Sequence, residues 1–226
     1  MNWPDMIGLW NTGDELMQAF SRLLPFLDLA SAAVFAITGA LVASRKEMDI
    51  LGFIWLGIVT GVGGGTLRDL LLDVPVFWVQ SPAPAIVCAI VAILVFFAAP
   101  MVQSRYQLIL WLDAVGMALV TVAGTAKALD AGVGSFVAVV MGVITAAVGG
   151  IIRDTLGQEP SILLRREIYV TAALLGAVSY VVFISIGLSA VSAAFLGFAF
   201  ALTLRLCAIT FGWSMPGYRP RPGRPM

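Results

Sequence analysis

The chain has 226 residues, of which 60% are hydrophobic and 12% charged, and its 13 basic and 13 acidic side chains give a formal net charge of zero. Soluble domains average about 45–50% apolar and about 25% charged residues, so this composition excludes a soluble domain and indicates an integral membrane protein. The balanced charge argues against nucleic acid as a partner. Histidine is absent, and Cys88 and Cys207 lie in apolar runs, so we expect no metal site, no cofactor and no disulfide.

The apolar stretches, taken in chain order, predict an all-α integral membrane protein with seven transmembrane helices. Residues 1–25 mix aromatic and charged side chains, so we expect an interfacial segment there rather than a further span. Stretches long enough to cross about 30 Å of hydrocarbon follow at 26–44, 50–72, 82–101, 107–127, 135–157, 166–187 and 189–210. Residues 211–226 are rich in proline, glycine and arginine and predict a disordered cytoplasmic tail.

Residues 26–101 and 107–187 are two copies of one three-span unit. Matching residues recur at a fixed offset of 85 positions, as Asp28 and Asp113 do, and the clearest copies read GGGTLRD from Gly63 and VGGIIRD from Val148. Because each copy holds an odd number of spans, the second enters the bilayer upside down, and 189–210 is a seventh helix outside these inverted repeats. Such repeats are typical of transport, and since the chain lacks a catalytic constellation we do not expect an enzyme.

Lysine and arginine residues predict the orientation of the chain. Nine of them flank spans on one side of the bilayer, and two, Arg22 and Lys127, lie on the other. Because the cytoplasmic side carries the excess, we expect the N-terminus outside, the C-terminus in the cytoplasm, and a location in the inner membrane of a bacterium or archaeon.

Consecutive glycines interrupt the second and fifth spans. Each costs roughly 1 kcal/mol of helix stability relative to alanine, so we expect these helices to kink or unwind there and to line a pore. In each span a threonine comes before the glycines and an aspartate comes after them. Carboxylates such as these attract cations. Tight helix packing is the alternative explanation for any single glycine. The predicted pore and kink positions are Gly63, Gly64, Gly65, Gly149, Gly150, Thr60, Thr145, Asp69 and Asp154.

Charged residues inside the spans predict two ion pairs. The topology places Asp28 and Arg68 at similar depth near the outer face, and Asp113 and Arg153 near the cytoplasmic face, so we expect contact within each pair. The alternative to a role in the pore is that these ion pairs only hold the helices in place. Arg68 and its neighbour Asp69 are expected to point in different directions and need not pair with each other.

Lys127, at the outer end of the fourth span, has no basic counterpart in the first copy, where Val42 occupies the equivalent position. One interpretation is that its ammonium group snorkels to the membrane interface. The other is that an unpaired lysine near an outer mouth gates or tunes the entry of cations.

The two glycine-glycine-x-x-arginine-aspartate motifs, each within a three-span repeat and followed by a seventh span, resemble the prokaryotic branch of the trimeric intracellular cation (TRIC) channel family. This bacterial two-repeat membrane family is also labelled a glycine transporter, and the resemblance covers about residues 28–210. It implies a homotrimer among membrane lipids, with a separate pore in each protomer. It further implies that the second and fifth spans line this pore and that potassium and sodium permeate without a metabolic energy source. The basic loop with which animal members bind phosphoinositides has no clear equivalent in this chain.

Three functions remain open at this point. The first is a passive channel for monovalent cations, and the alternative is a secondary transporter for a small solute such as glycine. A membrane scaffold without transport is the third. Charged pairs at mid-depth outside the motifs are absent from the sequence, which favours a channel because ion-coupled carriers usually use such groups.

Overall fold

The computed structural model describes residues 3–101, 104–160 and 168–215, and this part of the chain is helical without a β-strand. Six helices are long and apolar enough to cross a membrane, and a shorter apolar helix, α7, brings the spans to seven. The predicted all-α membrane fold is therefore confirmed. The elements are α1 (Trp3–Arg45), α2 (Ile50–Leu71), α3 (Phe77–Gln80), α4 (Ala83–Ala98), the 3₁₀ turn η1 (Ala99–Met101), α5 (Arg105–Asp130), α6 (Ser135–Leu156), α7 (Val170–Ser185) and α8 (Ala190–Phe211).

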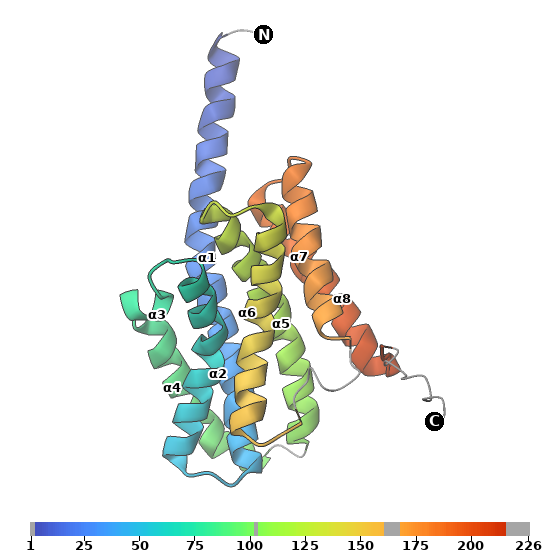
Figure 1. Ribbon diagram of the computed structural model, residues 1–226. Coiled ribbons are helices and arrows are strands. Elements are labelled where there is room, and N and C mark those ends of the chain that lie inside the picture. The colour runs from blue at the N-terminus through green and yellow to red at the C-terminus, as the bar shows by residue number, and fades with distance from the viewer. Residues whose placement is uncertain (1–2, 102–103, 161–167, 216–226) are drawn as a thin grey trace, which may run out of the picture.

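Helix α1 differs from the expected division between an interfacial segment and a first span. It is one continuous helix of 43 residues that contains Pro25, and its apolar part is Leu24–Arg45. The N-terminal half projects beyond the other helices in Figure 1. Residues 216–226, expected to form a disordered tail, lie outside the described residues.

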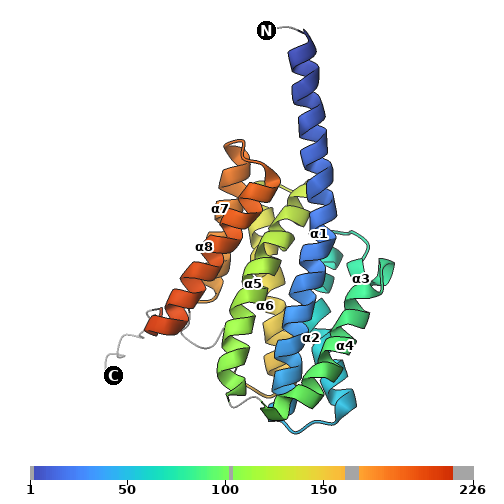
Figure 2. The same ribbon diagram turned by 180° about the vertical axis from the view of Figure 1, so that it is seen from behind.

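The bundle is built from two groups of three helices. Helices α1, α2 and α4 pack against one another, as do α5, α6 and α7, and the groups meet where α1 packs on α5 and α2 on α6. Equivalent helices of the two groups run in opposite directions, so that α1 descends in Figure 1 while α5 ascends, and Figure 2 shows α8 beside α5 and α7 from behind. We call the end with the 72–82 and 131–134 loops the outer end, and the end with the 46–49 turn the inner end.

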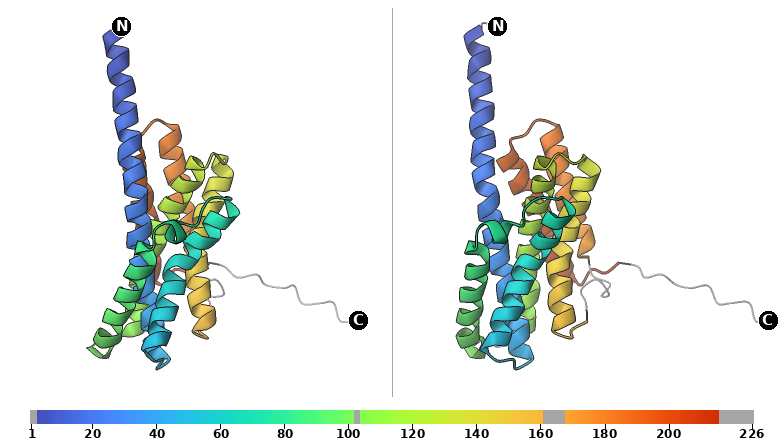
Figure 3. Two further views of the ribbon diagram at one scale, coloured as in Figure 1. Left: turned by 90° about the vertical axis from the view of Figure 1, so that its left-hand side faces the viewer. Right: turned by 60° about the vertical axis from the view of Figure 1, so that its left-hand side comes forward.

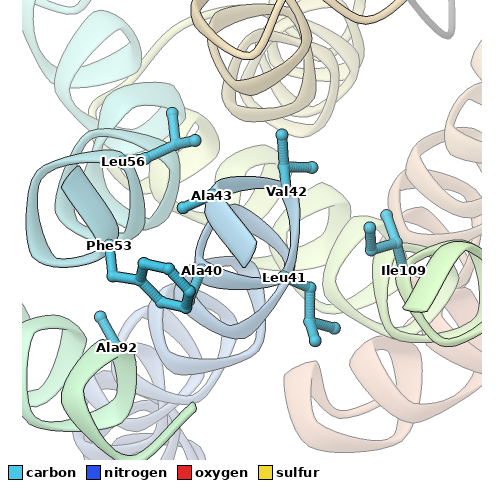
Figure 4. Packing of buried hydrophobic residues seen from close by; sticks show 8 residues of the cluster. All are labelled: Ala40, Leu41, Val42, Ala43, Phe53, Leu56, Ala92 and Ile109. Carbon is cyan, nitrogen blue, oxygen red and sulfur yellow. The ribbon is translucent and has the colours of Figure 1, made fainter. Parts of the chain in front are cut away.

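Small side chains, alanine and glycine, at the centre of the bundle allow other helices to pack closely around α1. In Figure 4, the ring of Phe53 on α2 extends toward α1 and lies near Ala92 of α4, and Leu41 lies on the side of α1 that faces Ile109 of α5. Ala40 beside them is fully buried. Small residues allow such close approach of helices where lipid supplies no hydrophobic driving force.

The glycines of the two motifs lie where α2 and α6 pack against each other. These two helices lie side by side in both views of Figure 3. A Cβ atom added to Gly64 would collide with the carbonyl oxygen of Thr145, and one added to Gly149 would lie 2.9 Å from the carbonyl oxygen of Thr60. The contact is thus reciprocal between the two copies. Both helices remain continuous through their glycines, so of the expected kink or unwinding the unwinding is wrong. The absence of a Cβ permits direct backbone packing instead.

Replacement of Gly64 by alanine should therefore destabilise the protein by about 1–3 kcal/mol, the usual cost of overpacking a close contact. Gly150→Ala is the matched control, because its Cβ would meet Asp113 Oδ1 and the Tyr169 hydroxyl only at 3.8 Å, an ordinary contact. Greater helix propensity should leave that variant unchanged or more stable by about 1 kcal/mol. Thermal unfolding of the purified variants in detergent checks this, and equal melting temperatures would contradict the packing role of Gly64.

Candidate functional site

The outer end of the bundle contains a cluster of charges around Arg68. This arginine is fully buried, and its Nη1 and Nη2 donate to Asp28 Oδ1 and Oδ2 at 2.9 and 3.2 Å. Asp28 on α1 and Arg68 on α2 lie about equally far from the turn that joins these antiparallel helices, which brings them to the same depth. The structure thus brings together the first pair expected from the sequence.

The inner end contains the equivalent cluster around Arg153. Its Nη1 donates to Asp113 Oδ1 at 2.6 Å and to Thr38 Oγ1 at 3.1 Å, and the guanidinium is 1% exposed. The second expected pair is therefore also in contact. Thr38 comes from α1, so this cluster joins both halves of the bundle.

Each arginine also bonds to the aspartate that follows it, contrary to the expectation that neighbouring side chains point apart. Arg68 Nε donates to Asp69 Oδ1 at 2.8 Å, and Arg153 Nε donates to Asp154 Oδ1 at 2.9 Å. The long arginine side chain curls so that its fork of donors reaches two carboxylates at once. A guanidinium buried at this depth needs such partners, because lipid offers none.

Lys127 is not unpaired, which corrects the expectation that its ammonium group is free. Its Nζ lies 2.9 Å from Asp69 Oδ1 and its side chain is 24% exposed. Asp69 Oδ2 also accepts a hydrogen bond from the backbone N–H of Phe77 at 2.9 Å. The Phe77 ring lies 5.7 Å from the guanidinium of Arg68 and 5.8 Å from the ammonium of Lys127, so it covers both cations.

The two predicted threonines lie at the crossing of α2 and α6. Thr60 Oγ1 donates to the carbonyl of Leu56 at 2.6 Å, and Thr145 Oγ1 donates to that of Met141. Each is 1% exposed. Their hydroxyls are thus bound to their own helices, a common state of threonine inside a span.

A cavity of about 760 Å³ lies beside the outer cluster, and Asp28, Phe77, Lys127 and Asp130 are among the residues that line it. The corresponding cavity at the inner end is much smaller, about 20 Å³. It is lined by Val42, Arg45, Tyr106, Ile109, Leu110, Arg153, Asp154 and Glu159. The two ends of the bundle are therefore similar in their ion pairs and very different in the space beside them.

An ion-pair cluster at the inner mouth was missed by the sequence analysis. Arg45 Nη2 and Lys46 Nζ each lie 3.4 Å from Glu159 Oε1. A position-by-position comparison of the two copies supplies the signal, because the equivalents of Arg45 and Glu159 at the outer end are Asp130 and Val74. The motifs are shared between the copies, whereas the charges at the mouths are not.

Arg205 of α8 is one of the nine basic residues that the orientation count assigned to the cytoplasmic side, but it is 1% exposed within the bundle. Its guanidinium lies 5.2 Å from the centre of the Tyr169 ring, and the Tyr169 hydroxyl donates to the carbonyl of Ala146 on α6 at 3.0 Å. Arg205 therefore ties the seventh span to the second repeat, and it contributes nothing to the flanking charge that predicts orientation.

Comparison with known proteins supports a membrane transport fold. A family model described as glycine transporter matches residues 25–100 and 110–185. The inner membrane protein YadS of Escherichia coli K12, of the UPF0126 group, is 40% identical over 202 residues, which cover 87% of this chain and 96% of YadS. A UPF0126 membrane protein of Vibrio cholerae is 37% identical over 207 residues, with coverage of 88% and 84%.

Two solved structures have the same fold. The TRIC trimeric intracellular cation channel orthologue from Rhodobacter sphaeroides is 52% identical, with a TM-score of 0.82, and the match covers 84% of this chain and 99% of that one. A prokaryotic TRIC channel in 0.5 M KCl is 27% identical, with a TM-score of 0.80 and coverage of 86% and 100%. The fold and the paired sites define a multi-pass membrane protein of the cation-channel class. The chain belongs to the prokaryotic TRIC channel family, whose family model bears the glycine transporter description.

The outer ion pair should behave as a coupled unit in mutagenesis. Arg68→Ala and Asp28→Ala should each destabilise the protein by about 3–5 kcal/mol, because each leaves a buried charge without its partner. The double variant should lose less than the sum of the two. Arg45→Ala serves as the control, since the ion pair of Arg45 with Glu159 is partly exposed and should contribute less than about 1 kcal/mol. Chemical denaturation in detergent measures the cycle, and additive losses from Arg68 and Asp28 would show that the pair contributes no coupling.

Proposed function

We propose that this chain is a passive channel for the monovalent cations potassium and sodium, assembled as a homotrimer with one pathway in each protomer. The observation that carries the proposal is the pair of buried arginine–carboxylate clusters at opposite ends of the α2–α6 crossing, each beside a cavity. The names of the structural relatives, which are cation channels and in one case trimeric, support the same function.

The proposed route begins in the outer cavity, whose carboxylates Asp28 and Asp130 attract cations. It passes Asp69, crosses between α2 and α6 beside Gly64 and Gly149, and leaves past Asp154. The backbone contact of Gly64 with Thr145 closes the crossing in this conformation. Conduction therefore requires α2 and α6 to move apart, and the glycines leave no side chains in the gap that opens.

Lys127 is suited to control entry to this route. Lys127 lines the outer cavity, and its ammonium lies 2.9 Å from each oxygen of the buried Asp69. A cation that follows the route has to displace the Lys127 ammonium or pass the Asp69 carboxylate while Lys127 neutralises it. We therefore assign Lys127 the role of a charge that tunes conduction.

A secondary transporter for a small solute such as glycine is the second candidate. The unequal cavities, about 760 and 20 Å³, resemble the open and closed sides of an alternating-access carrier. The glycine transporter description of the family model also favours it.

Recordings from the purified protein in a planar bilayer, with gradients of potassium against choline, separate the two candidates. A channel should give unitary current steps of picoampere size that reverse at the potassium potential. Carriers turn over too slowly to give such steps. If well-incorporated protein gives no current steps and proteoliposomes take up glycine, the carrier is the correct function and the channel is wrong.

The same recordings test the assignment of Lys127. Lys127→Met should raise the unitary potassium conductance, because removal of the ammonium leaves the Asp69 carboxylate exposed to the passing ion. Lys127→Arg, which keeps the charge, is the matched control. Equal conductance in the methionine and arginine variants would place Lys127 outside the route.

The proposed orientation has the N-terminus outside and the C-terminus in the cytoplasm. In a chain whose Cys88 and Cys207 are replaced by alanine, single cysteines in the 73–81 loop should react with an impermeant thiol reagent applied to intact cells. Cysteines in residues 158–160 should react only after lysis, because the odd number of spans per repeat puts these equivalent segments on opposite faces. Labelling of both from outside would refute the inversion.

A further inference from the structure

The ring of Phe77, on the short helix α3, stands between the outer cavity and the carboxylate that the proposed route has to pass. Asp69 is 0% exposed and is not among the described residues that line this cavity, whereas Phe77 and Lys127 both line it. A cation in the outer cavity therefore meets the Phe77 ring and the Lys127 ammonium before it meets Asp69.

Three contacts with α2 hold α3 in this place. The backbone N–H of Phe77 donates to Asp69 Oδ2 at 2.9 Å, and the indole Nε1 of Trp78 donates to Thr66 Oγ1 at 2.8 Å. The Phe77 ring packs on Gly65, where an added Cβ would lie 2.7 Å from the ring carbon Cε1. The ring thus rests against bare backbone, and a single methyl group at this position would have to displace it.

The charges beneath the ring favour its position. The ring centre lies 5.7 Å from the guanidinium of Arg68 and 5.8 Å from the ammonium of Lys127. An aromatic face attracts a cation within about 6 Å of its centre. Both attractions are lost when the ring moves away, so they favour the arrangement in which the ring covers the cluster.

The second copy of the repeat lacks these contacts. Aliphatic side chains replace the hydroxyl of Thr66, the ring of Phe77 and the indole donor of Trp78 at the equivalent positions, Ile151, Ile162 and Leu163. At Gly150, the equivalent of Gly65, an added Cβ would meet no described atom closer than 3.7 Å. The sequence therefore places this set of contacts at the outer end alone.

We propose that Phe77 is the outer closing residue of the pathway: its ring shields Asp69 from the outer cavity, and a cation passes only when the ring leaves Gly65. The inference rests on the proposed function and deepens it, because it names the residue that controls access to the route. Lys127 tunes the charge that a passing ion meets, whereas Phe77 determines how often the way to Asp69 is open. The crossing of α2 and α6 is a second closure in series with this one.

Chemical modification of Lys127 tests the shielding independently of conduction. The chain has two lysines, and Lys46, whose side chain is 35% exposed at the inner end, is the internal reference. In Phe77→Ala, a water-soluble acetylating reagent should modify Lys127 about fivefold faster relative to Lys46 than in the wild type, the factor that corresponds to one lost cation–π contact. Gly65→Ala, whose Cβ displaces the ring, should do the same, and Gly150→Ala is the matched control that should keep the wild-type ratio. An unchanged ratio in Phe77→Ala and Gly65→Ala would overturn the proposal.

Potassium currents in a planar bilayer test the consequence for the route. Phe77→Ala and Gly65→Ala should raise the ratio of open to closed time about fivefold at an unchanged unitary conductance, because the closed arrangement loses the attraction of the ring. Gly150→Ala should keep the wild-type ratio. If the wild type conducts and all variants match it, the role of Phe77 is wrong and the channel stands. If the wild type gives no current, the channel and the pathway role are wrong, and faster modification of Lys127 would support the shield alone.

Trp78→Phe keeps the test decisive if Phe77→Ala and Gly65→Ala do not fold. This variant removes only the indole donor to Thr66 Oγ1, so it should loosen α3 and speed the modification of Lys127 by a smaller factor. Thr66→Val removes the acceptor of the same hydrogen bond and should have the same effect, and the double variant should add nothing to either. Modification of Lys127 at the wild-type rate in both single variants would overturn the proposal.

Discussion

Two guanidinium groups buried at membrane depth constrain the rest of this structure. Lipid supplies no water to Arg68 or Arg153, so each has to lie where two carboxylates meet it. Asp28 and Asp113, which open the two repeats, provide the distant partners and thereby fix the register of α1 on α2 and of α5 on α6. Once these registers are set, the glycines of α2 and α6 face each other across the crossing, and the helices pack without side chains between them.

The fold and the distant ion pairs could be predicted because both follow from counting along the chain. Spans have a length set by the bilayer, and residues equally far from a tight turn lie at equal depth. The contact of Arg68 with Asp69, and of Lys127 with Asp69, could not be predicted in this way. Both depend on how a long flexible side chain bends, and helical spacing describes only the direction of its first bond.

The glycines show a second limit of prediction from local propensity. Three consecutive glycines weaken an isolated helix, and a kink or unwinding was the expected result, yet α2 does not unwind at Gly63, Gly64 and Gly65. Contact with the backbone of α6 compensates the intrinsic cost, and such long-range packing leaves no signature in the α2 segment itself. The matching glycines in the second copy were the relevant signal, because they belong to two surfaces that meet.

The differences between the copies concentrate at the mouths of the proposed route. The shared motif residues build the framework, whereas the pairs Lys127 and Val42, and Asp130 and Arg45, differ in charge. A molecule with twofold internal symmetry would respond equally to ions arriving from either side. These differences make the two mouths of the proposed route electrically distinct.

Helix α7 has a consequence for the membrane around the protein. Its 16 residues, at about 1.5 Å each, span about 24 Å, less than the about 30 Å of a typical hydrocarbon core. Val178 and Val182 on its surface are 41% and 47% exposed and face the surroundings of the bundle. A span shorter than the hydrocarbon core is accommodated by local thinning of the bilayer, so lipid acyl-chain length becomes a mechanical load on α7. Bilayer thickness thereby acts on α6, because the Tyr169 hydroxyl at the start of α7 donates to the carbonyl of Ala146.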